Sequence, residues 1–550
     1  MEEKRLQTLI EEMWPRLKKK HLYPEIPIPK VGRVIDSFDE KSDQEDSNQR
    51  VGLEMKEKQM TINPAFIASM KDKMSEENLI EALLDHGITH YTFCPWDFQT
   101  HLMLYAEAKK VLGDKESAKR AANYFIDVIA DTHCVKMRET EIPELHRNLK
   151  KGNVEKVIAS LYQRIWGIDM GLTPSQFESR QNEEVVRRLA RIPYLDRSRW
   201  TESIRKFARS LKPLLILEEK EKESRGGGKG DSNPQGEHNL NHYSYEEIDE
   251  GLREYAQKTM GLSEFREVVE DFSSELKEMG YGIEAGMGRG RGAPIDADIL
   301  FYMKLAEHYS IPLKKIPMEE AGTLHPHSHS PWEVGSPFQD IDVWTSFGKI
   351  MPGITQVWKK REGKGRGKVE EAPDCLIIID SSGSMINPRK SLSYAVLGAA
   401  CATNAYLKND SKVAVYNFSD APMGGREILD YTENKNEIYR TLCRYFGGGT
   451  ALDLEDMMPL IKKEKKVDLF IITDMKITNL ETLIGFFGKI QNRITAVHIG
   501  ENPYASRFEK AVEKKKNINI FTVKKKEDIP HIVLGSIRQY FNTMQNNHSA

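Results

Sequence analysis

The sequence has little of what disulfide-stabilised, secreted or membrane-spanning proteins need. Its five cysteines are scattered and form no CxxC pair, so we expect free thiols rather than a disulfide framework. No apolar run approaches the roughly 20 residues of a membrane span. The charged N-terminus, MEEKRLQTLIEEMW, lacks the apolar core of a secretory signal. We therefore expect a cytoplasmic protein that does not insert into a membrane.

Neither sign of charge is in excess. The chain has 80 basic and 83 acidic side chains, a balance that creates no global field for nucleic acid, so no nucleic-acid partner is expected. A nucleotide-binding P-loop is also missing, because no Lys-Ser or Lys-Thr pair follows the glycines at 447–449. Any ATP-driven step would have to come from a partner.

A chain of 550 residues is too long for one hydrophobic core, and its composition changes several times. Helical apolar spacing dominates the first half, whereas Gly, Ser, Asn and charge mark a linker before the second. We predict an N-terminal helix with a flexible acidic segment (1–60), an all-helical domain (61–217), a disordered linker (218–245), a helical segment with a loop-rich connector (246–372), and an α/β domain (373–550).

The last domain alternates short β-branched runs with helical segments. The predicted strands are DCLIIID, KVAVYNFS, DLFIITD, RITAVHIG and INIFTV, and a helix, HIVLGSIRQYFNTM, closes the chain. Nearly continuous apolar strands separated by helices indicate a doubly wound parallel sheet that is buried on both faces. Such sheets bind ligands in the loops at the carboxyl ends of their strands.

Oxygen-bearing side chains occupy three of those loops. The first strand runs into Asp380, Ser382 and Ser384, a glycine-rich loop precedes Thr450, and Asp474 follows the strand DLFIIT. We expect two carboxylates and three hydroxyls to converge at one edge of the sheet. This set of oxygen ligands suits Mg²⁺, or alternatively Mn²⁺ or Ca²⁺, and the absence of Cys and His argues against zinc.

These five residues resemble the metal-ion-dependent adhesion site of von Willebrand factor A domains. Asp380, Ser382 and Ser384 match its DxSxS signature, while Thr450 and Asp474 match its second-loop threonine and third-loop aspartate. The resemblance implies that the hydroxyls bind the metal directly and that an acidic residue of a protein partner fills the open coordination position. Prokaryotic proteins of similar architecture work beside MoxR-type AAA+ ATPases in complex maturation or metal insertion, or serve as chelatase accessory subunits.

The helical domain holds a second candidate site. His86 and His90 are four residues apart, so they share one helix face and would chelate one metal ion together. The region resembles the metallopeptidase-like helical domain that precedes some von Willebrand A-like domains. That resemblance makes Asp131 the third ligand of a Zn²⁺ ion and implies a metallohydrolase as the alternative function. Histidines that only pack within a helix bundle are the plainer interpretation.

One position departs from the metallopeptidase pattern. Gly87 stands where the HExxH motif has its glutamate, the general base that activates the metal-bound water. Standard hydrolysis is therefore not expected unless another carboxylate replaces it, and Glu81 and Glu107 are the nearby choices. His133 and His146 are further candidate ligands.

Overall fold

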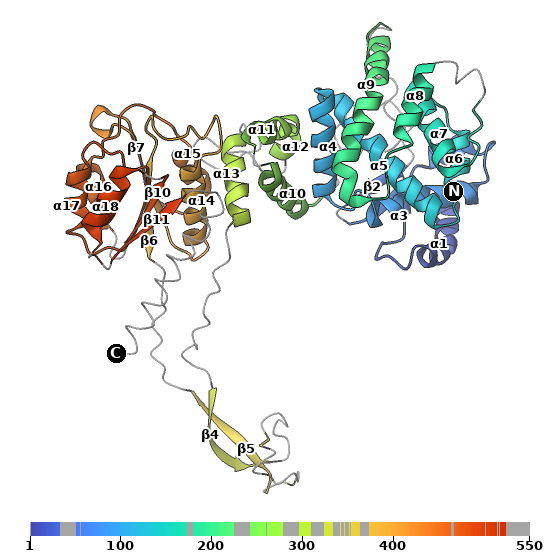
Figure 1. Cartoon of the computed structure of the whole chain (residues 1–550). Coiled ribbons are helices and arrows are strands. Elements are labelled where there is room, and N and C mark those ends of the chain that lie inside the picture. The colour runs from blue at the N-terminus through green and yellow to red at the C-terminus, as the bar shows by residue number, and fades with distance from the viewer. Residues whose placement is uncertain are drawn as a thin grey trace. The chain divides into compact units, whose positions relative to one another are not determined.

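The computed structural model describes most of the chain. The residues it describes are 2–32, 51–55, 57–172, 180–224, 243–259, 261–278, 296–309, 324–333, 341–342, 346, 351, 354–362, 373–463, 467–500, 502–513, 515 and 517–523. The chain divides into two units (Figure 1). The helical unit comprises Met1–His308 with Arg389–Leu392, and the sheet unit comprises Tyr309–Pro388 with Ser393–Ala550.

The helical unit is built from helices with one small sheet. Its helices are α1 (Glu2–Lys20), α2 (Pro64–Met70), α3 (Glu76–Thr92), α4 (Phe98–Leu112), α5 (Lys115–Met137), α6 (Ile142–Asn148), α7 (Asn153–Trp166), α8 (Arg180–Leu189), α9 (Trp200–Ser224), α10 (Tyr245–Thr259), α11 (Leu262–Asp271), α12 (Ser273–Glu278) and α13 (Ala297–Tyr309). The described residues of the predicted helical domain, 61–217, are mostly helical, and they belong to one unit with α1 and with α10–α13. The predicted linker is shorter than expected, since α9 continues to Ser224.

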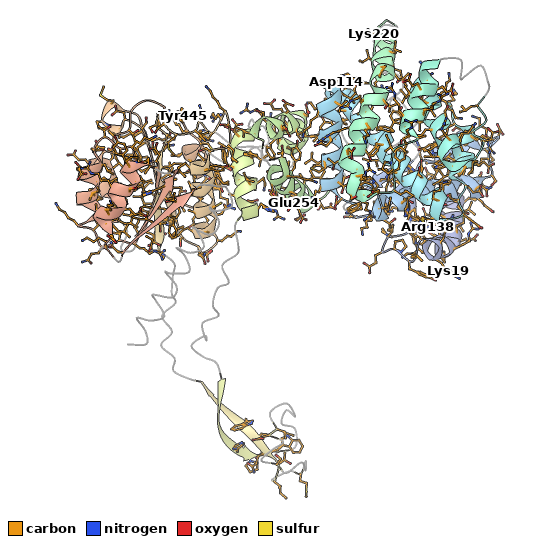
Figure 2. The ribbon with its side chains drawn as sticks, in the orientation of Figure 1. Lys19, Asp114, Arg138, Lys220, Glu254 and Tyr445 are labelled. Atoms are coloured by element: carbon orange, nitrogen blue, oxygen red, sulfur yellow. The ribbon has the colours of Figure 1, made fainter. Side chains whose placement is uncertain are left out.

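Helix α5 is the central element of this unit, and it packs against α3, α4, α7 and α9. Its start is defined by Asp114, labelled in Figure 2, whose carboxylate accepts a hydrogen bond from the Ser117 backbone N–H at 2.7 Å. Helix α3 begins in the same way, with Ser75 accepting from Asn78 and two glutamates in the first turn. The N-termini of both helices are therefore defined by capping side chains.

A small sheet covers one side of α3. Its strands are β1 (Lys30–Val31), β2 (Val51–Glu54) and β3 (Gln59–Ile62), with β3 in the middle, parallel to β1 and antiparallel to β2. Both β2 and β3 contact α3. The sequence prediction missed this sheet because its strands are only two to four residues long.

The sheet unit contains a six-stranded sheet in the order β11-β10-β9-β6-β7-β8. The strands are β6 (Asp374–Asp380), β7 (Val413–Phe418), β8 (Arg426–Thr432), β9 (Val467–Thr473), β10 (Ile494–Ile499) and β11 (Ile518–Val523). Its helices are α14 (Tyr394–Leu407), α15 (Lys435–Leu442), α16 (Leu454–Lys463), α17 (Leu480–Phe487) and α18 (Pro503–Val512).

Helices cover both faces of this sheet, as the doubly wound prediction requires. Helices α14 and α15 pack together over β6, β7 and β9. On the opposite face, alternate strand residues such as Leu376 and Ile378 join one buried cluster with apolar side chains of α16, α17 and α18. The central strands β6, β7 and β9 are buried almost throughout, which explains their near-continuous apolar sequence.

The five predicted strands are present and mutually parallel, but the sheet is mixed. Strand β8 pairs antiparallel with β7 at the edge and was not predicted, because its half-exposed residues do not form an apolar run. In the predicted loop-rich connector, β4 (Leu324–Pro331) and β5 (Gln356–Glu362) form an antiparallel pair. The predicted acidic segment, most of the linker and the closing helix lie outside the described residues.

Candidate metal centres

The first candidate site lies at the carboxyl ends of β6 and β9, which are neighbours in the centre of the sheet. The chain leaves β6 toward β7 and β8 and returns to β9 on the other side, so the strand order reverses between these two strands. Doubly wound sheets bind ligands in the crevice at such a reversal. Asp380 ends β6, and Asp474 directly follows β9.

Asp380 is held by a hydrogen bond to each carboxylate oxygen. Its Oδ1 accepts from the Ser382 backbone N–H at 2.9 Å, and its Oδ2 accepts from the Thr473 hydroxyl at 2.6 Å. The side chain is buried, and burial raises the pKa of its carboxyl, with a smaller contribution from the nearby charge of Asp474. Thr473, which sequence reasoning missed, therefore fixes the central carboxylate of the site from the next strand.

The glycine-rich loop lies directly against the DxSxS loop. The Gly447 N–H donates to the Ser381 carbonyl at 2.9 Å, and the Gly383 N–H donates to the Gly448 carbonyl at 3.0 Å. Gly447 and Gly448 have φ angles of 70° and 90°, a conformation that favours glycine. The Ser419 hydroxyl contacts the carbonyls of Gly447 and Gly449 at 2.5 and 2.8 Å, which holds the loop in place.

The remaining predicted ligands border the same loops. The hydroxyl oxygens of Ser382 and Ser384 are 3.2 Å apart, and Thr450 is buried directly after the glycine loop. Asp474 is also buried, and its Oδ2 lies 3.1 Å from the ammonium of Lys476, a neighbour that the sequence prediction did not consider. A divalent cation would compete with this lysine for the Asp474 carboxylate. The donor set consists of hard oxygen atoms and fits Mg²⁺, Mn²⁺ or Ca²⁺.

The second candidate site lies between α3 and α5 in the helical unit. One ligand atom each of His86, His90 and Asp127 lies within 4.8 Å of the others. The two Nε2 atoms of the histidines are 3.0 Å apart, and Nε2 of His90 is 3.4 Å from Oδ1 of Asp127. His90 and Asp127 are buried, whereas the His86 side chain is 18% exposed and gives the group its contact with solvent.

The hydrogen-bond partners of the two Nδ1 atoms determine which nitrogen of each imidazole is available to bind a cation. Nδ1 of His86 lies 2.7 Å from Oδ1 of Asp131, and Nδ1 of His90 lies 2.8 Å from the Cys94 carbonyl oxygen. Both partners are hydrogen-bond acceptors, so each Nδ1 carries a hydrogen, and in the neutral imidazoles each Nε2 then presents a lone pair. Two lone pairs and a carboxylate then face one another, an arrangement that a cation or a shared proton stabilises. Two imidazoles and a carboxylate suit zinc.

Asp131 does not belong to this ligand group, which contains Asp127, one helical turn earlier, instead. The carboxylate of Asp131 contacts His86, Nε2 of His146 at 2.8 Å and the Tyr162 hydroxyl at 3.0 Å. Burial alone would raise the pKa of Asp131, but the two histidines hold it well below the usual range. Asp131 is thus an ionised carboxylate that orients His86, as the outer partners of metal-bound histidines do.

Gly87 leaves no space for the missing glutamate. A Cβ atom on this residue would lie 2.6 Å from Sδ of Met60 and 3.1 Å from Cδ2 of Leu53, because β2 and β3 pack directly over α3. The sequence has no glutamate at this position of the HExxH pattern, and the side chains of Met60 and Leu53 occupy the space that a larger residue would need.

The suggested replacements for that base are engaged elsewhere. Glu81 pairs with Arg16 and Lys20, and Glu107 pairs with Lys110 and Arg205. His133 stacks on Phe93 with ring centroids 3.8 Å apart, and burial lowers its pKa to about 4, helped by Arg138 and Arg197. Neither glutamate nor His133 joins the ligand group, and His146 reaches it only through Asp131.

Comparison with known proteins gives no family assignment. No protein-family model and no curated protein matches the chain. Across the described residues, we also find no helix with the length and apolar character needed to cross a membrane. The two sites are therefore interpreted from their geometry and chemistry.

Proposed function

We propose that the sheet unit is a von Willebrand factor A-like domain that captures a protein partner through a bound divalent cation. The observation that carries this proposal is the pair of buried carboxylates, Asp380 and Asp474, beside serine hydroxyls at the reversal of strand order. Asp380, Ser382, Ser384, Thr450 and Asp474 would hold Mg²⁺, or Mn²⁺ or Ca²⁺, with one coordination position left for an acidic side chain of the partner.

The edge of the site supports contact with a protein surface. Ser384 is exposed, and two residues further on Ile386 leaves 46% of its surface open to solvent. The Tyr445 hydroxyl donates to the Met385 carbonyl at 3.3 Å and steadies this loop. A partner carboxylate on the metal and an apolar contact with Ile386 would together give a specific, cation-dependent interface.

The partner class we propose is a MoxR-type AAA+ ATPase. In this arrangement the chain acts as an adaptor in the maturation of a protein complex or in metal insertion, and a chelatase accessory subunit would operate in the same way. The absence of a P-loop sequence fits a division of labour in which the partner hydrolyses ATP.

The adaptor proposal is tested by capture of such an ATPase from the same organism on the immobilised full-length chain. Capture is expected with Mg²⁺ and should disappear with EDTA or in an Asp380→Ala variant. Asp430→Asn, which changes an exposed aspartate of β8, is the matched control and should leave capture intact. Equal capture by wild type and Asp380→Ala, with and without EDTA, would show that the proposal is wrong.

A second function is favoured by the group formed by His86, His90 and Asp127. We infer that the helical unit binds Zn²⁺ there, in the manner of a metallohydrolase that lacks its usual base. Elemental analysis should find zinc in the wild type and one equivalent less in a His86→Ala/His90→Ala variant. Zinc contents that do not differ between the two proteins would remove this function and the hydrolase with it.

A further inference from the structure

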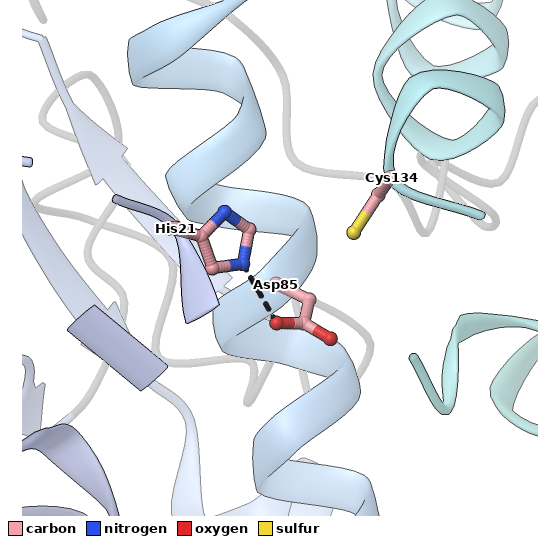
Figure 3. Close-up of side chains that lie close together, drawn as sticks. All are labelled: His21, Asp85 and Cys134. Carbon is pink, nitrogen blue, oxygen red and sulfur yellow. Dashed lines mark hydrogen bonds and ion pairs between the residues drawn. The ribbon is translucent and has the colours of Figure 1, made fainter. Parts of the chain in front are cut away.

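A third group of metal-ligating side chains lies in the helical unit, outside both sites described above. His21 directly follows α1, Asp85 belongs to α3 and Cys134 to α5 (Figure 3). A nitrogen, an oxygen and a sulfur atom of these residues lie within 4.8 Å of one another, and all three residues are buried. Figure 3 shows the three side chains directed toward one another from separate elements.

The two oxygens of the Asp85 carboxylate have different surroundings. Oδ2 accepts hydrogen bonds from the Lys20 ammonium at 2.6 Å and the Thr140 hydroxyl at 2.5 Å. Oδ1 instead faces Nε2 of His21 at 2.8 Å. Hydrogen bonds to one oxygen fix the carboxylate and leave the other directed at the imidazole, which is how outer partners hold a metal-binding carboxylate.

The surrounding charges can accommodate a divalent cation. Lys20 also pairs with Glu81 at 2.7 Å, so Asp85 is not the only carboxylate beside this ammonium group. A metal ion bound by the Asp85 carboxylate and a Cys134 thiolate would form a neutral group. A buried charged site requires such compensation.

A nucleophilic role for Cys134 does not fit its surroundings. Burial, and to a smaller extent the negative charge of Asp85, raises the pKa of this thiol to about 12. Without a metal ion the thiol is therefore protonated at neutral pH. A buried thiol also cannot meet a substrate. A coordinating ion, in contrast, replaces the thiol proton and needs no access for a large molecule.

We propose that His21, Asp85 and Cys134 form a structural site for Zn²⁺ or a chemically similar transition-metal ion. One sulfur, one nitrogen and one oxygen ligand are the combination that selects such ions over Mg²⁺ or Ca²⁺. The site would join the end of α1 to α3 and α5, and His21 and Asp85 are 64 positions apart in the sequence. Because Asp85 precedes His86 on α3, the bound ion would also fix the helix that carries the other histidines.

The test uses the full-length chain loaded with Co²⁺ in place of zinc. A thiolate bound to Co²⁺ gives a charge-transfer band in the near ultraviolet, which a site made only of histidine and carboxylate cannot give. The wild type is expected to show this band, and Cys134→Ser to lose it. Cys401→Ser, which changes a buried cysteine of the sheet unit, should retain it. The His86→Ala/His90→Ala variant should retain it as well, which separates the two sites.

A second variant keeps the test decisive if Cys134→Ser fails to fold. His21→Gln removes the nitrogen ligand and should weaken cobalt binding to the thiolate at least tenfold in a titration followed by the same band. Absence of the band from the wild type, or its persistence in Cys134→Ser, would overturn the proposal.

Discussion

The oxygen site of the sheet unit and the nitrogen site of the helical unit are built in opposite ways. The first uses loops at strand ends, and three of its candidate ligand residues, Ser382, Ser384 and Thr450, are adjacent to exposed glycines. The second lies between two helices, and its histidines are held by Asp131 and the Cys94 carbonyl. We expect a loop site to lose its ion at little cost to the fold, whereas the site between two helices links its candidate ligands to the stability of the helix bundle.

The largest difference should come from removing a carboxylate at each site. Asp131→Ala leaves His86, His146 and Tyr162 without their buried partner, so we expect a loss of about 3–5 kcal/mol in the unfolding free energy of the helical unit. Asp474→Ala removes a pair with the half-exposed Lys476 and should cost the sheet unit about 1 kcal/mol or less. Denaturant unfolding measures both, and equal losses would refute the contrast.

Two glycines sharpen the comparison through packing. Gly87→Ala forces a methyl group against Met60 and Leu53, and we expect it to destabilise the helical unit by about 1–3 kcal/mol. Gly485→Ala in α17 meets no atom within 4 Å and should stabilise the sheet unit by up to about 1 kcal/mol. Thermal unfolding of the two variants should therefore shift in opposite directions, and a stabilising Gly87→Ala would show that the strands yield easily.

A pH titration should affect both units alike. Burial lowers the pKa of His498 on β10 to about 4, below the usual 6.5, and His133 of the helical unit is lowered to the same value. Between these pH values the unfolded chain binds more protons than the folded one, so stability is present above about pH 6.5 and falls as the pH drops toward 4.

For each of these two histidines, of which His498 is buried and His133 partly exposed, we expect a loss of about 1–2 kcal/mol over this window. Unfolding free energies measured from pH 7 to pH 4 would show it. His498→Gln should make the curve of the sheet unit flatter while leaving that of the helical unit unchanged. If the pH dependence of the variant's sheet unit matches that of the wild type, the pKa of His498 does not differ between the folded and unfolded chain.

The smallest expected effect concerns the metal-free sheet unit. Since burial raises the pKa of Asp380, its ionised form is disfavoured, and Asp380→Asn should stabilise the protein in EDTA by up to about 1 kcal/mol. Added Mg²⁺ should raise the melting temperature of the wild type but not that of the variant. A variant that Mg²⁺ stabilises as much as the wild type would show that Asp380 is not a ligand.

The central parallel strands of the sheet could be predicted from the sequence, whereas the edge strand β8 and the strand β4 could not. Buried parallel strands such as β6 and β9 have long β-branched runs, and their ends mark the candidate loops without any knowledge of contacts. Strand β8 gave no such signal, because only central strands are buried on both faces. Strand β4 contains two prolines and several histidines, which led to its prediction as a loop.

The helical site could be predicted only in part. The spacing of His86 and His90 indicates a shared helix face, but Asp127 and Asp131 are themselves four residues apart on α5 and share a face too. Which of them lies near the Nε2 atoms of the histidines depends on how α3 and α5 are aligned along their axes, and tertiary packing decides that. The group of His21, Asp85 and Cys134 joins three distant segments and left no local pattern in the sequence.

The contacts of Ser419 with the glycine loop have a consequence for the rate of cation exchange. Since the loop is already held at Gly447 and Gly449, binding of an ion would need no rearrangement of this loop, although Lys476 would have to leave the Asp474 carboxylate. We then expect the slow step to be the release of water from the ion, which Mg²⁺ gives up reluctantly. Partner complexes formed through Mg²⁺ would accordingly assemble more slowly than those formed through Ca²⁺, so the identity of the ion would determine the association rate.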